Sequence, residues 1–319
     1  MNYKSLMITA ALGVGMGMAS PALAGPFLID VDNDFSGNDS TTTGEIRTLG
    51  TSDSLATSFY FGDPNVAGTQ IVDTNIQSDM DGFGFSSGTF TAVDGSSSVS
   101  LSDPNDVGDR NVVNLNPEDG IGGVNFRNGF SAGDWASDGL GWGLTFDYRL
   151  EGQVIETADG LSLEYTSGFF DAFFEDGASG DRTQVMRMNV ESSDLQAANL
   201  DLFGSLDYNG DWDHDSEFVQ NFFVDAATGR TFYDIASEEG GSGTPISWRL
   251  DTNVDPPLPE ADQLVQIDEA TFVRQSELNS TVRYEVPEPG MLVLLGTGLL
   301  FLGFLATRRR QTLGNDFRA

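Results

Sequence analysis

The chain has 319 residues, 39% of them hydrophobic and 11% aromatic, so it can fill at least one sizeable core. Its formal net charge is −34 and Lys4 is its single lysine, which makes DNA, RNA and anionic lipid poor partners. The absence of cysteine excludes disulfides, Cys-ligated metals and thiol catalysis.

The N-terminus has the parts of a secretory signal peptide. Lys4 precedes an apolar stretch over residues 6–19, and Ala22 and Ala24 form a small-residue cleavage site before Gly25. A membrane anchor is the alternative, but the apolar stretch is short and rich in glycine. We therefore expect export, with removal of residues 1–24.

A polar segment with flexible character is expected over residues 25–44. Its pattern Asp32, Asp34, Ser36, Gly37 fits the opening of an EF-hand calcium loop, but Thr43 stands where the closing glutamate belongs. A solvated acidic turn is the alternative.

Alternating apolar and polar residues predict a β-strand body over residues 45–286. The clearest strands are expected at residues 141–150, 161–166, 184–190 and 246–251. Two hairpins are expected, with turns at residues 226–229 and 276–280.

The expected fold class is all-β, an antiparallel β-sandwich or jelly roll, because strands are short, convincing long helices are absent and Asp-Gly turn pairs recur. The segment 69–133, rich in glycine, serine and aspartate, is expected either as long loops or as a small sheet of its own.

One loop in the body is the better candidate for a metal site. Short acidic and amide side chains alternate along "DYNGDWDHDSE", and Ca²⁺ prefers oxygen ligands of this kind. The spacing is not that of an EF-hand, and a solvated acidic loop is again the alternative. The predicted Ca²⁺ ligands are Asp207, Asn209, Asp211, Asp213 and Asp215. No other cofactor is predicted.

Catalysis is not expected. His214 is the only histidine and lies in that acidic loop, away from any nucleophile turn, so a Ser-His-Asp triad is disfavoured. The enzyme alternative is a carbohydrate-active jelly roll that uses a carboxylate pair. Glu164 and Glu175 flank the aromatic run "GFFDAFF", which suggests a sugar cleft, although a plain core strand explains the same run.

The C-terminus combines an apolar segment with a basic cluster. Residues 290–306 carry no charge and are long enough for a short transmembrane helix. Arg308, Arg309 and Arg310 follow, and the positive-inside rule places them in the cytoplasm with residues 311–319. The acidic body is then outside, in agreement with the signal peptide.

The segment Val286 to Arg310 resembles the PEP-CTERM sorting signal of Gram-negative bacteria. Pro287, Glu288 and Pro289 match its first part, and the apolar segment and arginine cluster match the rest, although nine further residues follow the cluster. The resemblance implies recognition and cleavage near this motif by an exosortase-type enzyme in the inner membrane. The two prolines suit this role, because they oppose helix formation and keep the segment extended.

Together these patterns predict an exported protein of the cell surface or extracellular matrix. Its precursor is expected in the inner membrane, and its body is expected to be structural or to bind a ligand rather than to catalyse a reaction. The resemblance implies a bacterium that makes exopolysaccharide, so matrix carbohydrate and divalent cations are the expected partners.

Overall fold

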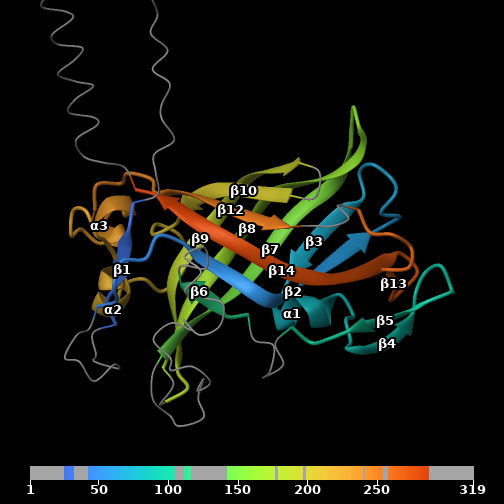
Figure 1. Ribbon diagram of the computed structural model, residues 1–319, viewed down its shortest axis with the longest axis horizontal. Coiled ribbons are helices and arrows are strands. Elements are labelled where there is room, and N and C mark those ends of the chain that lie inside the picture. Colours follow the sequence, from blue (N-terminus) through green and yellow to red (C-terminus); the bar gives the residue numbers. More distant parts are fainter. Residues whose placement is uncertain are drawn as a thin grey trace, which may run out of the picture.

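The computed structural model describes residues 25–31, 42–104, 111–115, 142–176, 179–196, 199–239, 241–253 and 258–286. Within these residues strands dominate and helices are short (Figure 1). In chain order the elements are β1 (Phe27–Ile29), β2 (Leu49–Phe61), β3 (Gln70–Thr74), α1 (Gln77–Gly82), β4 (Gly88–Thr91), β5 (Ser98–Leu101), β6 (Val113–Leu115), β7 (Trp142–Thr157), β8 (Gly160–Asp176), β9 (Arg182–Gln196), β10 (Asn199–Leu206), α2 (Glu217–Asn221), β11 (Phe223–Asp225), α3 (Phe232–Ala236), β12 (Ser247–Asn253), β13 (Val265–Gln266) and β14 (Thr271–Glu285).

One antiparallel sheet forms the body and closes on itself. Its order is β13-β14-β12-β10-β9-β8-β7-β3-β2-β6, and a further pairing joins β14 to β2. Because β14 contacts both β12 and β2, the strands from β2 to β14 form a continuous ring of antiparallel neighbours. Closure removes most of the unpaired strand edges that an open sheet would expose.

The expected all-β antiparallel class is confirmed, but the arrangement differs from a sandwich or jelly roll. Around the ring, successive main strands are neighbours in the order of the chain, whereas a jelly roll has two sheets joined by crossing connections. Local alternation cannot tell these arrangements apart, since both bury one face of each strand.

The four strands with the clearest alternation are confirmed as parts of β7, β8, β9 and β12. The first expected hairpin is partly right, because a turn over residues 226–229 joins Val224 and Thr231 in an antiparallel bridge, but a helix replaces its second strand. The second expected hairpin is wrong. Residues 232–236 form α3, where Thr231 and Asp234 make a reciprocal capping box that favours a helix start. Residues 271–285 form one continuous strand, with an irregularity between Leu278 and Ser280 in place of a turn.

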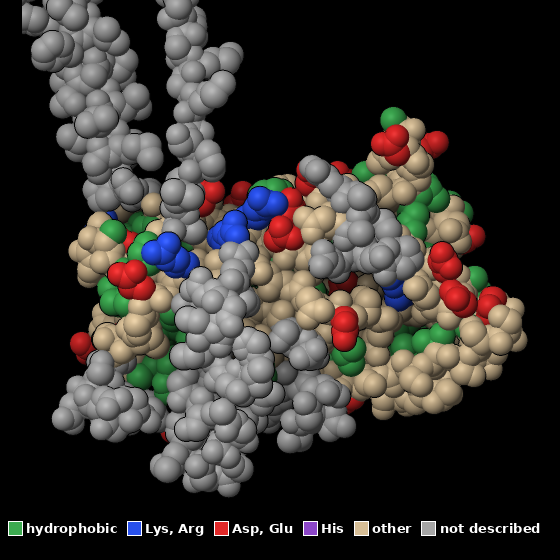
Figure 2. Space-filling model, viewed as in Figure 1, with side chains coloured by type: hydrophobic (Ala, Val, Ile, Leu, Met, Phe, Trp, Pro, Cys, Tyr) green, Lys and Arg blue, Asp and Glu red, His purple; other side chains and the backbone are tan. Residues whose placement is uncertain are grey.

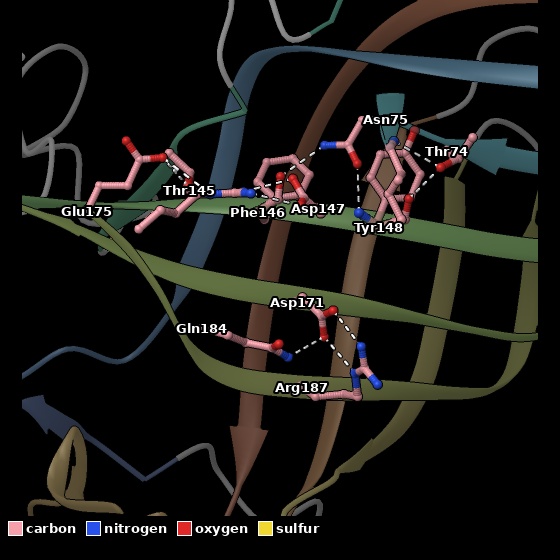
Figure 3. Close-up of polar contacts among 12 residues, drawn as sticks. Thr74, Asn75, Thr145, Phe146, Asp147, Tyr148, Asp171, Glu175, Gln184 and Arg187 are labelled. Carbon is pink, nitrogen blue, oxygen red and sulfur yellow. Dashed lines mark hydrogen bonds and ion pairs between the residues drawn. The ribbon is translucent and has the colours of Figure 1, made fainter. Parts of the chain in front are cut away.

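A side-chain amide fills a gap in the ring. β3 pairs with β7 only as far as Thr74. The next pairing along β7 is the bridge between Thr145 and Val112, which precedes β6, the strand that pairs with β2. Between them, Asn75 accepts from the backbone N–H of Tyr148 (2.7 Å) and donates to the carbonyl of Phe146 (2.9 Å; Figure 3). These are the bonds that a strand neighbour would make, so Asn75 continues the ladder along β7.

The inside of the closed sheet is filled with side chains. The alternate residues Leu144, Phe146 and Tyr148 of β7 are all buried, as their period of two predicts. Two interior cavities lined by described residues measure about 30 Å³ each, far below the size of a small-molecule pocket. The interior therefore serves as a core rather than as a ligand chamber.

Aromatic side chains from outside the ring extend this core. Phe27 of β1, Phe223 of β11 and Phe232 of α3 contact one another, and Phe27 also meets the ring of Tyr284 in β14. These elements gather with α2 at one end of the molecule (Figure 1). A second, smaller core lies outside the ring, where Met80 of α1 and Leu101 of β5 pack with Phe59, Val265 and Val273.

The described parts of the segment 69–133 are neither all loops nor one separate sheet. β3 and β6 belong to the ring, and the hairpin β4–β5 forms a separate two-stranded sheet.

Candidate functional site

The two ends of the folded body lie together. The ring of Phe27, two residues after the expected mature start at Gly25, has its centroid 5.5 Å from that of Tyr284. Val286, the last described residue, still packs on the main core. Both expected cleavage points therefore adjoin the same end of the body, where β1, α3 and the end of β14 meet (Figure 1).

Most residues of the two expected cleavage sites and of the sorting signal lie outside the residues that the structure describes. Gly25 is described, whereas Ala22, Ala24 and the sorting residues Pro287, Glu288, Pro289 and Arg308 to Arg310 are not. The expected transmembrane segment 290–306 also lies outside it. Among the described residues, none of the helices has the length and apolar character needed to span a bilayer.

The predicted calcium loop is tied to the body by its first residues. The Asp207 carboxylate accepts from the backbone N–H of Asn209 and from the side-chain amide of Asn189, each at 3.0 Å. Asn209 in turn accepts from the backbone N–H of Glu238 at 2.7 Å. The oxygens that the sequence assigns to a metal are therefore already engaged in hydrogen bonds at these two positions.

The remaining predicted ligands, Asp211, Asp213 and Asp215, are exposed. In the described part of the chain, no three His, Asp or Glu side chains gather closely enough to hold a metal ion. Calcium binding by this loop stays a prediction. The earlier candidate, Asp32 to Gly37, lies outside the described residues.

A polar pocket of about 240 Å³ lies on the outer side of β7, β8 and the start of β9. Figure 3 shows Thr145, Asp147 and Glu175 beside one another on the neighbouring strands β7 and β8. Its polar lining consists of Asn111, Thr145, Asp147, Glu175 and Arg182.

Arg182 organises this pocket. Its two terminal nitrogens donate to the two oxygens of Asp147 at 2.8 Å each, and its Nε lies 3.4 Å from Glu175. The guanidinium also stacks on the ring of Phe173, 3.6 Å from the centroid. Thr145 donates its hydroxyl to Glu175 at 2.8 Å, so several contacts hold both carboxylates in place.

Asn111 completes the pocket with an unusual feature. Its side chain is 3% exposed, and its Oδ1 has no hydrogen-bond partner. The residue is fixed by its backbone carbonyl, which accepts from the N–H of Phe146 at 3.0 Å. A buried acceptor without a donor is costly, and this oxygen has less than 1 Å² of accessible surface, so it is not itself exposed to the pocket.

Sequence reasoning missed most of this pocket. It singled out Glu175, but as the partner of Glu164, and these residues lie eleven positions apart in the same strand. At about 3.3 Å per residue they are separated by roughly 36 Å, whereas a glycosidase pair needs about 5 to 10 Å. The alternation in β7 could have shown that Thr145 and Asp147 share the outward face of that strand. No sequence pattern connects Asn111 to these residues.

A second polar cluster is enclosed within the ring. The carboxylate of Asp73 in β3 accepts from the hydroxyls of Tyr148 (2.6 Å), Ser58 (2.8 Å) and Tyr165 (3.4 Å). Burial raises the pKa of Asp73 above its usual range, and the three hydroxyls and the charge of Arg274 oppose that increase. Since the cavity beside it is only about 30 Å³, this cluster is structural.

The acidic all-β body is followed in the sequence by an apolar segment and the three arginines Arg308 to Arg310. Residues 285–310 match the family model of the PEP-CTERM protein-sorting motif, so the resemblance seen in the sequence is confirmed. The chain carries this motif, which marks an exported, membrane-associated precursor and is of the type that exosortase-type enzymes recognise. Neither the curated proteins nor the solved structures gave a match to the chain.

Proposed function

We propose that the chain is the precursor of a protein of the cell surface or extracellular matrix. The segment 290–306 tethers it in the inner membrane, and an exosortase-type enzyme cleaves it near Pro287 to Pro289. The freed body, from Gly25 to the cleavage point, then acts outside the cell as a structural or ligand-binding protein.

The observation that carries this proposal is the junction between body and motif. β14 ends at Glu285, and the matched motif begins at that same residue. β14 is the strand that closes the ring through β2 and β12, so a cut within it would open the sheet. A cut after Val286 leaves every described strand intact.

The same junction limits how far the body stands from its tether. Five residue steps separate Glu285 from Gly290, and an extended chain spans at most about 3.6 Å per residue, or roughly 18 Å in total. The end of the body at Tyr284 therefore lies next to the membrane surface while the precursor is tethered. Because Pro287 and Pro289 oppose helix formation, we expect the cleavage enzyme to reach the chain between the body and the tether.

The role of the body is binding or scaffolding rather than catalysis in this proposal. Asp147 and Glu175 are neighbouring carboxylates in a pocket, as a glycosidase would require. However, both carboxylates are already held by the same guanidinium, that of Arg182. Carbohydrate and Ca²⁺ are the ligands we propose for the body. Figure 2 shows Asp and Glu side chains spread over its visible face.

The test is to replace Pro287, Glu288 and Pro289 together with alanine and to fractionate the producing cells. The apolar segment remains while the recognition element is lost, so the protein should accumulate in the membrane fraction at precursor mass. Replacing Pro256 and Pro257 with alanine is the matched control and should leave release unchanged. Release of the triple variant at the normal rate would refute the proposal.

A further inference from the structure

A buried carboxylate, that of Asp225 in β11, lies beside the residue at which the mature chain is expected to begin. We propose that removal of residues 1–24 creates an α-ammonium group at Gly25 that pairs with Asp225 and fastens β1 to the body. The site binds the chain's own new N-terminus, so signal-peptide cleavage stabilises the folded protein. This inference deepens the proposed function and rests on its start at Gly25, but not on processing at the C-terminal motif.

The Asp225 carboxylate has neutral partners where a charge is needed. The residue is 3% exposed. Its side chain accepts from the backbone N–H groups of Ala227 (3.3 Å) and Thr228 (3.1 Å) and from the Thr228 hydroxyl. In the described part of the chain, no arginine forms an ion pair with it. Because buried charges in proteins are as a rule paired, we expect a cation at this carboxylate.

A second turn in the body makes the same hydrogen bonds around an aspartate that is exposed. Asp268 accepts from the backbone N–H groups of Ala270 and Thr271 and from the Thr271 hydroxyl, in the same Asp-x-Ala-Thr pattern. Water can stabilise the charge of Asp268, whereas Asp225 is covered in its position opposite Phe27 of β1. Of these two carboxylates, Asp225 is the one that needs a partner other than water.

Gly25 is placed to supply this cation. β1 and β11 are antiparallel neighbours, and the N–H of Ala226 donates to the carbonyl of Pro26 at 3.0 Å, which brings Gly25 to the turn that Asp225 holds. A Cβ built on Gly25 would lie 3.8 Å from Asp225 Oδ1 and, beyond its chain neighbours, within 4 Å of no other atom. Once no residue precedes Gly25, rotation about its Cα–C bond can bring the α-nitrogen to that open position, because both bonds from Cα are about 1.5 Å long. The ammonium group then lies within the roughly 4 Å of an ion pair.

The pair joins the new N-terminus to the aromatic end of the core, because Phe27 packs on Phe223, Phe232 and Tyr284. In the uncleaved chain Gly25 has a neutral peptide N–H, and among the described residues this N–H makes no hydrogen bond to Asp225. Cleavage replaces it with an ammonium group that carries three donors and a charge. Charge-assisted hydrogen bonds are roughly twice as strong as neutral ones, so the cleaved chain gains a contact that the precursor lacks.

The test uses the fact that Lys4 is the single lysine of the chain. After residues 1–24 are removed, the α-amine of Gly25 is the sole primary amine, so acetylation of amines removes this one charge. In the signal-cleaved chain, purified in detergent with its tail, acetylation should lower the folding equilibrium constant about threefold or more in urea unfolding. It should have no such effect in Asp225→Asn, and its full effect in the matched control Asp268→Asn.

A second measurement reads the ion pair directly. Reductive methylation with ¹³C-formaldehyde keeps the charge of the amine and gives it an NMR signal. The pKa of this amine should lie above the usual range of about 7.7 to 8.0 and should return to that range in Asp225→Asn.

Equal effects of acetylation in the parent chain and in Asp225→Asn, or an amine pKa within the usual range, would overturn the inference. If Asp225→Asn does not fold, a chain that begins at Ala24 decides, because its amine is displaced by one residue, about 3.8 Å. Acetylation should leave the stability of that chain unchanged, and a loss as large as in the parent would again overturn the pair. Intact mass separates this result from the proposed function. A signal-cleaved chain that starts at another residue refutes the cleavage point and the pair together, whereas a chain that starts at Gly25 but does not respond to acetylation refutes the pair alone.

Discussion

Replacing Asp73 with alanine should strongly destabilise the closed sheet. Its carboxylate is the acceptor for the hydroxyls of Tyr148 and Ser58 at 2.6 and 2.8 Å, and each buried donor left without a partner costs about 1 to 3 kcal/mol. Arg274, 4% exposed, would also lose the attraction of this carboxylate, a smaller contribution than the hydrogen bonds.

These contributions overlap, because they arise from the same carboxylate, so we expect a loss of about 4 kcal/mol in the free energy of unfolding. That is a large share of the roughly 5 to 15 kcal/mol that stabilises a typical domain. Urea unfolding followed by tryptophan fluorescence measures it, with Asp262→Ala, an exposed aspartate, as the control that should change by less than about 0.5 kcal/mol. A loss below about 1 kcal/mol in Asp73→Ala, with an unchanged urea dependence, would refute our interpretation of the cluster.

Three further predictions concern pH, backbone packing and calcium. The folded-state pKa of Asp73 is raised above 3.8, so its protonation favours the folded state and that stability is lost as pH rises through the raised pKa. The stability of the parent chain relative to Asp73→Asn should therefore fall above about pH 4, by up to about 1.4 kcal/mol per pH unit; a pH-independent difference in urea unfolding would contradict this. Gly204→Ala should cost more than about 3 kcal/mol by the same measurement, because its Cβ would lie 1.8 Å from the carbonyl oxygen of Asn189, whereas Gly82→Ala has open space and should be neutral or better. If the loop at residues 207–215 binds Ca²⁺, calcium should raise the melting temperature beyond NaCl of matched ionic strength, and Asp211→Asn with Asp213→Asn should abolish that rise; equal effects of both salts would remove the site.

Local patterns in the sequence were enough for four strands of the ring, β7, β8, β9 and β12, but not for the others or for its closure. The alternation in β7 and β8 is visible in short windows, because it reflects only which face of each strand is buried. Closure depends on pairs such as Thr51 with Ser280, whose side chains hydrogen-bond across 229 positions of the chain. No period in a short window reports such a contact, so a two-sheet sandwich was an equally good expectation.

The sorting signal can be recognised from the sequence, whereas the pocket cannot. Pro287 to Pro289, the apolar segment and the arginine cluster follow one another within the matched residues 285–310, so the signal is readable from sequence. The pocket combines Asn111 before β6, Asp147 in β7 and Arg182 at the start of β9. Their spacing carries no information until the ring brings them together.

The most direct test of the proposed function is the intact mass of the mature protein recovered from its own host. The account predicts a chain that begins at Gly25 and ends between Val286 and Gly290, found outside the inner membrane, with all strands of the closed sheet retained. A released protein that still contains residues 290–306, or a mature chain cut within β14, would contradict it.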